Sequence, residues 1–389
     1  MHPAPEDRLP PPPPAAQALS AALSDAIRAE IATSGGWLSF ERFMERALYA
    51  PGLGYYSAGS TKLGAAGDFV TAPELSPLFG RCVARQLREL AADGFTEILE
   101  IGGGSGALAA EVLQDLAGSG DPPDRYLILE VSAELKERQR AHIAAAVPGL
   151  ANRVQWIDRL PVGAHSLVIA NEVLDAIPTR VVRTAGDAVQ ELGVGASEDG
   201  AHFERRFRPA AGELLSAVRS LRLPDSYETE INLRARAFTR SIAAAIERGV
   251  VFFIDYGYTA AEFYHPQRSR GTLMCHYRHH AHEDPFVLIG LQDITSHVDF
   301  TATADAALEG GMEVLGYTTQ AEFLINCGIT DMLGELDSAD LRSYAPVAAQ
   351  AQKLLSPAQM GERFKVLALA KGVSRPLMGF ARGDRTHTL

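Results

Sequence analysis

Cysteine is scarce in this chain of 389 residues: its 3 cysteines stand far apart, at Cys82, Cys275 and Cys327. An odd, widely spaced set argues against a disulfide framework and is typical of a reducing compartment. No apolar run reaches the ~18–20 residues of a membrane span. The N-terminal residues have neither the basic start and apolar core of a signal peptide nor the arginine-rich character of a mitochondrial presequence. We therefore expect a cytoplasmic protein without a membrane span.

Basic residues are outnumbered as well. The chain has 36 lysines and arginines against 48 aspartates and glutamates, which gives a formal net charge of −12. An acidic chain is a poor ligand for the phosphate backbone, and no basic arm compensates, so we do not expect nucleic acid as a partner. The hydrophobic content of 47% is ample for a globular core. The length permits one large domain with insertions, or two domains.

What the sequence does contain is an apolar strand that runs into a glycine cluster and then into a helix. Residues 97–101 predict a buried strand, and an apolar helical stripe begins after residue 106. Glycines leave no Cβ to block a ligand, and a helix N-terminus faces the same point. The pattern predicts a nucleotide-sized site at the carboxyl end of a central strand, formed by Gly102, Gly103, Gly104 and Gly106.

The next predicted strand, near 126–131, contains an acid at Glu130. A carboxylate at this strand tip can accept hydrogen bonds from two ribose hydroxyls. The alternative is a solvated strand end without a ligand. Because the arrangement serves NAD and S-adenosylmethionine equally, it leaves the cofactor open.

Strands and helices alternate after residue 95, which is typical of a doubly wound α/β fold. Two segments, 180–245 and 258–310, exceed ordinary loop lengths and are predicted as insertions on the substrate side, the first with a small antiparallel excursion. Expected strands lie near 97–101, 126–131, 153–157, 166–170, 249–254, 312–317 and 363–370, the last of them near a sheet edge. Around this domain, over 96–372, we expect a disordered proline-rich lead-in over 1–18, an N-terminal helical lid region over 19–95 and a flexible tail over 373–389.

The predicted strand near 166–170 ends in an amide and two acids, Asn171, Glu172 and Asp175. We expect Glu172 and Asp175 to be neighbours on the first turn of a helix, with capping as the alternative role. A nicotinamide enzyme would need a hydride-transfer site here, and no Tyr-Lys pair or His with an Arg clamp is obvious. Methyl transfer mainly requires alignment of the nucleophile, which carboxylates that bind a guanidinium or amine can supply.

Further candidates lie outside this segment. Tyr55 and Tyr56 can line a channel for the methyl acceptor, or they can simply pack in the core. Asp255 follows a predicted strand and is expected to meet substrate, as is Asp293. His297 lies near Asp293 and is a candidate proton acceptor, with a structural histidine as the alternative.

Several segments together resemble the MidA-like proteins, a family that includes the mitochondrial complex I assembly methyltransferase. The resemblance spans about residues 30–372 and is far more specific than the glycine loop alone. Its segments are YAPGLGYYS (49–57), GDFVTAPELS (67–76), EIGGGSG (100–106), NEVLDAIP (171–178), FIDYGY (253–258), GTLMC (271–275) and QDITSHVDF (292–300).

This resemblance implies a Rossmann-like, seven-stranded class I methyltransferase sheet and S-adenosyl-L-methionine as cofactor. It also implies a protein substrate, with arginine dimethylation on a respiratory complex I subunit for the mitochondrial relative. The glycine loop would bend around the methionine part of the cofactor, Glu130 would hold the ribose, and Asn171 and Glu172 would line the methyl-transfer end. Segment 67–76 would close over the cofactor, with Thr71 and Glu74 at its amino-acid end.

Two other functions stay open at this point: a NAD(P)-dependent oxidoreductase, and an assembly factor that retains a nucleotide pocket without catalysis. A metal site is not expected. The histidines between Cys275 and His282 lack the paired second half of a zinc site. A loop that contacts substrate is as plausible for this segment as a metal site.

Overall fold

The computed structural model describes residues 9–57 and 70–389. The chain divides into two compact units, which we name by their sheets. The α/β unit takes in Val70–Leu174, Arg236–Thr259 and Val298–Leu389, and the antiparallel unit takes in Met1–Phe69, Asp175–Ala235 and Ala260–His297. The predicted boundaries do not separate these units. The predicted lid region 19–95 is divided between them, and most of both predicted insertions belongs to the antiparallel unit.

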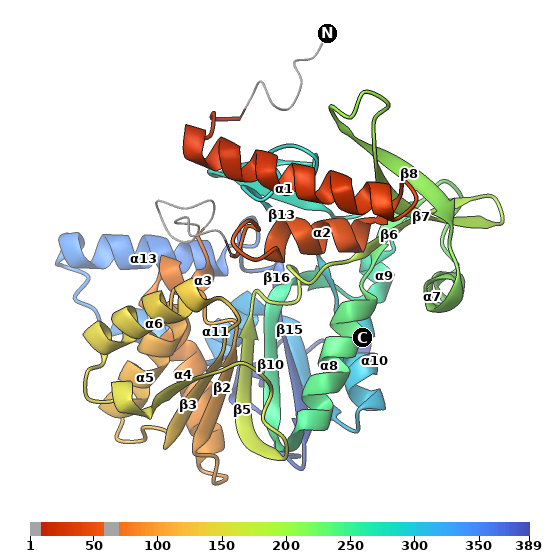
Figure 1. Ribbon diagram of the computed structural model, residues 1–389. Helices are drawn as coiled ribbons and strands as arrows, with labels where there is room; N and C mark the ends of the chain where they lie inside the picture. The colour runs from red at the N-terminus through yellow and green to blue at the C-terminus, as the bar shows by residue number, and fades with distance from the viewer. Residues whose placement is uncertain (1–8, 58–69) are drawn as a thin grey trace. The chain divides into compact units, whose positions relative to one another are not determined.

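The α/β unit is built on a mixed sheet with the strand order β15-β16-β10-β5-β2-β3-β4 (Figure 1). Strands β4, β3, β2, β5 and β10 are parallel, and β16 is antiparallel to both of its neighbours. This confirms the expected seven-stranded sheet, beside which two-residue β14 pairs with β10. The strands are β2 (Glu97–Ile101), β3 (Arg125–Leu129), β4 (Val154–Ile157), β5 (Ala164–Asn171), β10 (Ile246–Tyr258), β14 (Val298–Asp299), β15 (Glu313–Thr319) and β16 (Phe364–Lys371).

Strand β16 is the second strand from the sheet edge, which confirms its predicted place near an edge. It lies between β10 and β15, so β15 forms the edge. Seven of its eight residues are buried, and side chains of alternate residues point to opposite faces of a sheet. A strand that is covered on both faces is mostly apolar whether it has one neighbouring strand or two, so the sequence did not distinguish the edge position from the next one.

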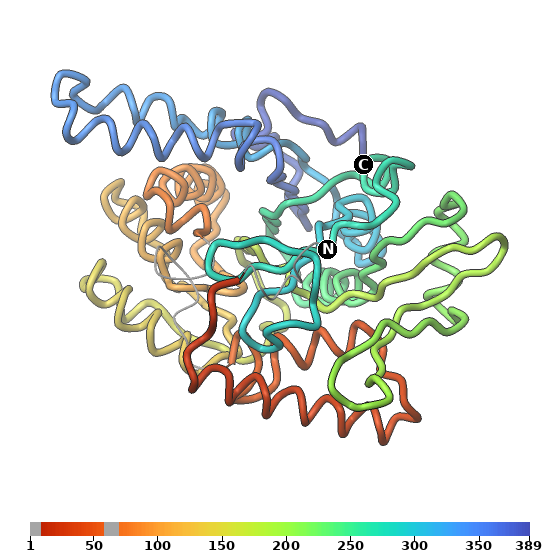
Figure 2. Tube along the Cα trace, turned by 90° about the horizontal axis from the view of Figure 1, so that it is seen from above, coloured from red at the N-terminus to blue at the C-terminus, as the bar shows by residue number. Residues whose placement is uncertain are grey.

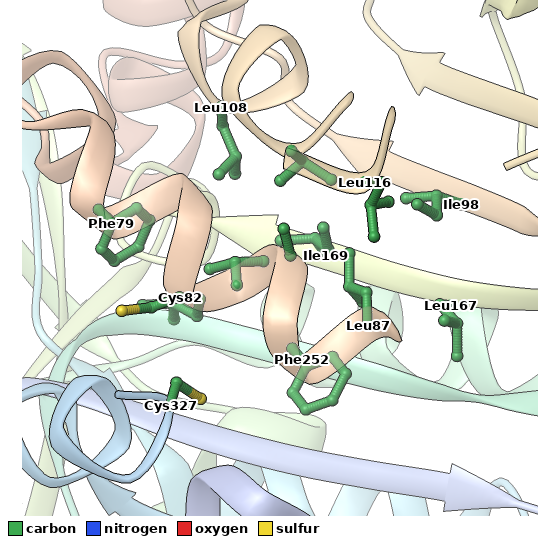
Figure 3. Packing of buried hydrophobic residues seen from close by; sticks show 14 of the residues in the cluster. Phe79, Cys82, Leu87, Ile98, Leu108, Leu116, Leu167, Ile169, Phe252 and Cys327 are labelled. Atoms are coloured by element: carbon green, nitrogen blue, oxygen red, sulfur yellow. The ribbon is translucent and has the colours of Figure 1, made fainter. Parts of the chain in front are cut away.

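Helices cover both faces of this sheet. Figure 1 shows α8 and α10 on the opposite side of the strands from α4 and α5, and Figure 2 shows α4, α5 and α6 side by side. In Figure 3, Leu87 of α4 lies beside Ile169 and Phe252 of the sheet, and Phe79 and Cys82 of the same helix belong to the same buried cluster. The helices of the unit are α3 (Ala72–Leu75), α4 (Pro77–Ala91), α5 (Ala107–Gly118), α6 (Ala133–Ala146), α8 (Leu233–Ala245, which begins in the antiparallel unit), α10 (Phe300–Glu309), α11 (Gln320–Asn326), α12 (Ile329–Gly334) and α13 (Leu341–Leu355).

The antiparallel unit contains two sheets. Strands β1 (Leu38–Ser39), β7 (Ala188–Ala196), β6 (Arg180–Ala185) and β9 (Glu228–Ile231) pair in that order, and β8 (Phe203–Pro209) pairs with β7. This confirms the antiparallel excursion predicted within 180–245. A three-stranded sheet has the order β12 (His280–His282), β11 (Met274–Tyr277), β13 (Asp293–Thr295). The unit's helices are α1 (Pro14–Thr33), α2 (Phe40–Tyr49), α7 (Gly212–Leu221) and α9 (Ala260–Phe263).

At both ends of the chain, residues that were predicted to be disordered or flexible take part in regular structure or hydrogen bonds. Residues 1–8 lie outside the described residues, but α1 begins at Pro14, inside the predicted lead-in, because proline is favoured in the first helical turn. In the tail, the amide of Arg385 donates to the carbonyl of Tyr317 at 2.6 Å, and Asp384 Oδ1 accepts from the Tyr317 amide at 3.0 Å. These bonds continue the edge strand β15 and hold the tail against it.

Within the part of the chain that the structure describes, every helix is too short or too polar to cross a bilayer.

Candidate functional site

The glycine loop joins β2 to α5 in the α/β unit. Gly102, Gly104 and Gly106 have φ values of 73°, 52° and 85°, which residues with a Cβ rarely adopt. At Gly103, a Cβ would lie 2.9 Å from Ile128 Cγ2 and 3.0 Å from Gln139 Nε2, so a side chain has no room. The loop therefore requires glycine for its conformation and for close packing, and Gly106 forms the N-cap of α5.

Glu130 follows β3 directly and is 7% exposed, so it is not a solvated strand end. Its Oε1 accepts from the Ser132 amide at 2.9 Å, and its Oε2 accepts from Gln139 Nε2 at 3.1 Å. Burial raises the pKa of the Glu130 carboxyl, while the hydrogen bonds from Ser132 and Gln139 oppose that rise. A carboxylate has about four lone-pair sites on its two oxygens, so Glu130 keeps acceptor capacity for a ligand hydroxyl.

Gln139 of α6 is a residue that the sequence analysis missed. Its Nε2 donates to Glu130 and also to the carbonyl of Gly104 at 3.0 Å, while its Oε1 accepts from Trp156 Nε1 at 2.7 Å. One fully buried amide thus joins the glycine loop, the acid of β3 and the end of β4. Its neighbours in the sequence are polar and charged, so no pattern marked it as buried.

Asn171 ends β5, which is parallel to β2, with Ala170 in register with Ile101. Asn171 and Gly102 therefore follow paired residues at the same edge of the sheet. Asn171 Nδ2 donates to Glu172 Oε1 at 3.1 Å, and its buried Oδ1 accepts no hydrogen bond from the residues that the structure describes. An acceptor beside the glycine loop is thus available to a donor on a ligand.

The helix predicted after β5 is wrong. Residues 172–178 form bends and turns, and Glu172 has a left-handed φ of 53°. Asp175 belongs to the antiparallel unit, whereas Glu172 belongs to the α/β unit. The two acids are therefore not neighbours on a helical turn, because the strand ends in a strained residue instead of a cap.

Asp255 lies inside β10 and is 1% exposed. Its Oδ2 accepts from the amides of Val173 at 3.2 Å and Leu174 at 2.9 Å, and its Oδ1 accepts from the Tyr256 amide at 2.9 Å. The sequence predicted a substrate contact here. The carboxylate binds backbone amides of the turn after β5, and a substrate contact stays a prediction.

The remaining cofactor candidates lie around the glycine loop helix. Thr71 precedes α3 and Glu74 lies on it, and α3 packs against α4 and α5. Residues 67–69 of the predicted closing segment lie outside the described residues. Trp156 of β4 packs against the core and has the Arg140 guanidinium 4.8 Å from its ring centre. Asp158 is paired with Lys136.

A second group of predicted residues comes together in the antiparallel unit. Tyr56 Oη donates to both carboxylate oxygens of Asp293 at 3.1 Å, across 237 positions of sequence. Tyr49 stacks on Tyr56 with ring centres 5.4 Å apart, and Tyr55 meets it edge-on at 5.0 Å. Asp175 accepts from the Ser296 amide through its carbonyl at 3.1 Å. Burial, and then the Asp293 carboxylate, raise the pKa of Tyr56 well above its ordinary value.

His297 also belongs to the antiparallel unit, next to β13. Its amide donates to Thr272 Oγ1 at 3.0 Å, and Thr272 in turn donates to the buried carboxylate of Glu230 at 3.0 Å. Asp299, which follows it closely in sequence, caps α10 by accepting from Ala302 at 3.0 Å. The backbone of His297 is thus firmly placed.

The histidine-rich segment forms the β11–β12 hairpin, with Cys275 paired to His282 and Tyr277 to His280. Burial, and then His282, lower the pKa of His276. Across residues 9–57 and 70–389, no group of three or more His, Cys, Asp or Glu side chains is placed to hold a metal ion.

Comparison with known proteins decides the family. A family model described as S-adenosyl-L-methionine-dependent methyltransferase matches residues 78–318. The chain belongs to this family. The match covers α4, the whole glycine loop, the tip of β5 and β10. It confirms the methyltransferase class and its cofactor, and it decides against the nicotinamide alternative that the glycine loop left open.

Two kinds of relatives support this assignment. The chain is 49% identical to a Burkholderia thailandensis protein crystallised with S-adenosyl-homocysteine, over 98% of this chain and 100% of that one, with a TM-score of 0.95. It is 29% identical to the Drosophila melanogaster protein arginine methyltransferase NDUFAF7 homolog, mitochondrial, over 92% of this chain and 88% of the relative. The Caenorhabditis elegans homolog is 27% identical over 86% of this chain and 83% of its own. These relatives confirm the resemblance to the MidA-like proteins.

The residues around β2 fit the family's cofactor. The left-handed glycine loop has no Cβ atom to block a ligand, Glu130 keeps spare acceptor capacity, and the buried Asn171 Oδ1 accepts no hydrogen bond from the described residues. These groups match the amino group and the ribose hydroxyls of a methionine-linked nucleoside.

Proposed function

We propose that the protein transfers a methyl group from S-adenosyl-L-methionine to an arginine side chain of a protein substrate. The observation that carries the proposal is the half-buried Asn171–Glu172 pair beside the glycine loop, an amide and a carboxylate joined by a hydrogen bond. A carboxylate is the natural bidentate partner of a guanidinium. The names of the curated relatives support the same acceptor.

When bound, the cofactor supplies an electrophilic methyl group on a sulfonium. In the proposed arrangement the glycine loop, with Thr71 and Glu74, holds the methionine part, and Glu130 holds the ribose hydroxyls. Glu172 pairs with the guanidinium and fixes one of its nitrogens, while Asn171 orients that group through its free acceptor oxygen. The rate acceleration comes mainly from alignment, because in-line methyl transfer needs little more than a correctly placed nucleophile.

Proton removal needs a base, because arginine stays protonated at neutral pH. The new N–C bond forms as the S–C bond breaks, and one guanidinium proton then leaves the nitrogen. Glu172 and His297 are the candidate acceptors of that proton. Tyr55, Tyr56, Asp175 and Asp293 are the proposed substrate-binding residues of the antiparallel unit.

The test is a transfer assay with radiolabelled methyl donor and an extract of cells that lack the protein. We expect label in protein, with mass spectrometry placing it on dimethylarginine, and about 100-fold slower transfer in Glu172→Gln. A respiratory complex I subunit is the first substrate to examine by name. Label on lysine or on a small molecule would contradict the arginine assignment.

The alternative of a non-catalytic assembly factor makes a different prediction. If Glu172→Ala abolished methylation but left the assembly of its partner complex intact, methylation would be dispensable for that role. We expect both to fail together.

A further inference from the structure

The turn after β5 is attached to β10 by hydrogen bonds on three successive residues. The Glu172 amide donates to the Ile254 carbonyl at 2.9 Å, and the Val173 and Leu174 amides both donate to Asp255 Oδ2, at 3.2 Å and 2.9 Å. The other oxygen of Asp255 accepts from Tyr256 at 2.9 Å, which fixes the plane of the carboxylate.

This attachment holds a conformation that the chain would not adopt unaided. Glu172 has φ 53°, and a residue with a Cβ is disfavoured there because the Cβ approaches its own backbone oxygen. Such strained residues persist only where the surroundings determine them, and they concentrate at functional sites. Here the surroundings are the backbone of Ile254 and the side chain of Asp255.

The side chains that this turn directs are those at the tip of β5. Glu172 is half-buried, and its carboxylate accepts from Asn171. Asp255 is 1% exposed and lies one residue beyond the strand pairing of Ile254 with Asn171. Asp255 therefore contacts the chain that follows Glu172 through the backbone amides of residues 173 and 174.

We propose that Asp255 is a positioning residue for methyl transfer: by binding the amides of Val173 and Leu174 it holds Glu172 in the orientation that meets the acceptor. The inference rests on the proposed function. It assigns no contact between Asp255 and either substrate.

Four variants test it: Asp255→Ala, Asp255→Asn, Glu172→Gln and the double variant Asp255→Asn/Glu172→Gln. Alanine removes all three acceptor contacts, whereas asparagine keeps one acceptor oxygen and the shape. We expect kcat to fall about 100-fold in Asp255→Ala and about 10-fold in Asp255→Asn, with the KM for the methyl donor and the Kd for S-adenosyl-homocysteine changed less than about threefold. If Asp255→Ala does not fold, the asparagine variant carries the test.

The double variant separates positioning from a general loss of stability. If Asp255 acts through Glu172, the double variant should have the kcat of Glu172→Gln alone, because nothing remains to be positioned. Multiplied losses would overturn the inference. Glu89→Gln is the matched control, since the Glu89 carboxylate also accepts a backbone amide, that of Met378 at 2.9 Å, elsewhere in the α/β unit. We expect it to lose stability and keep kcat.

Amide hydrogen exchange provides a readout that does not depend on activity. Exchange at Val173 and Leu174 should rise at least about tenfold in Asp255→Ala and stay unchanged in Glu89→Gln. Unchanged exchange in Asp255→Ala would overturn the inference even for an active enzyme. A wild-type protein that methylates no arginine, with exchange behaving as expected, would instead overturn the proposed function.

Discussion

The side-chain amide of Gln139 donates a hydrogen bond to Glu130 Oε2 at 3.1 Å. Because the same nitrogen also reaches the Gly104 carbonyl at 3.0 Å, this contact ties the proposed ribose-binding acid to the loop that would surround the methionine part of the cofactor. Both residues are buried, so the bond is shielded from competition by water.

Replacing Gln139 with leucine should weaken cofactor binding without removing a direct contact. Glu130 would lose a hydrogen bond to a charged group, an effect of about 1.5–3 kcal/mol, which corresponds to about a 10–100-fold rise in the Kd for S-adenosyl-homocysteine. Isothermal titration calorimetry measures it. Arg138→Leu, one position away on α6, is the control. Equal affinities in the two variants would mean that Gln139 does not organise the site.

Gly103→Ala should damage the loop by collision. The new Cβ would meet Ile128 Cγ2 at 2.9 Å and Gln139 Nε2 at 3.0 Å, so β3 or α6 would have to shift. We expect a loss of about 1–3 kcal/mol in the free energy of unfolding, together with weaker cofactor binding. Urea denaturation monitored by circular dichroism measures the stability.

Gly118→Ala is the control for that substitution, because no atom lies within 4 Å of its added Cβ. Its free energy of unfolding should stay within about 0.5 kcal/mol of the wild type. If the Gly103→Ala protein were as stable as the Gly118→Ala protein, the glycine loop could accommodate a Cβ without loss of stability, and the prediction would be wrong.

Stability should fall as the pH rises toward 8. Burial raises the pKa of Glu111 from 4.5 to about 8, and that of Glu100 from 4.5 to about 7. Between pH 4.5 and these folded-state pKa values, the two carboxyls hold protons in the folded protein that they have released in the unfolded chain. The stabilisation is complete below pH 4.5 and is lost as the pH rises through the folded-state values, by at most about 1.4 kcal/mol per pH unit for each group.

Glu111→Gln should therefore flatten the dependence of the unfolding free energy on pH, measured by urea denaturation from about pH 5 to pH 8. Glu313→Gln, at an exposed position of β15, should leave the slope unchanged. Parallel curves for wild type and Glu111→Gln would show that Glu111 ionises normally in the folded state.

The thiols should be unreactive in the folded protein. All three cysteines are buried, and burial raises the pKa of Cys82 to about 12 and the pKa values of Cys275 and Cys327 well above the ordinary range. Since the thiolate is the reactive form, Ellman's reagent at pH near 8 should modify them about 100-fold more slowly than free cysteine. Denaturant should expose all three. Rapid reaction of one thiol before unfolding would reveal local opening around it.

Much of this protein follows from the sequence alone. The glycine loop, the strands β2, β3, β5 and β10 and the acid after β3 are local patterns: apolar runs, missing Cβ atoms and an acid at a strand tip. Such patterns predict the α/β sheet and its cofactor class, because each depends only on residues that are close in the chain.

The tertiary structure alone decided the rest. Tyr56 and Asp293 meet across 237 residues, Gln139 is buried within a polar helix, and β16 lies inside the sheet because β15 covers its other edge. Asp255 was visible as an acid beside a strand, but its partners are backbone amides more than 80 positions away. Buried polar side chains acquire their hydrogen-bond partners only when distant segments pack together and exclude water. The roles of these residues could therefore not be assigned before the fold was known.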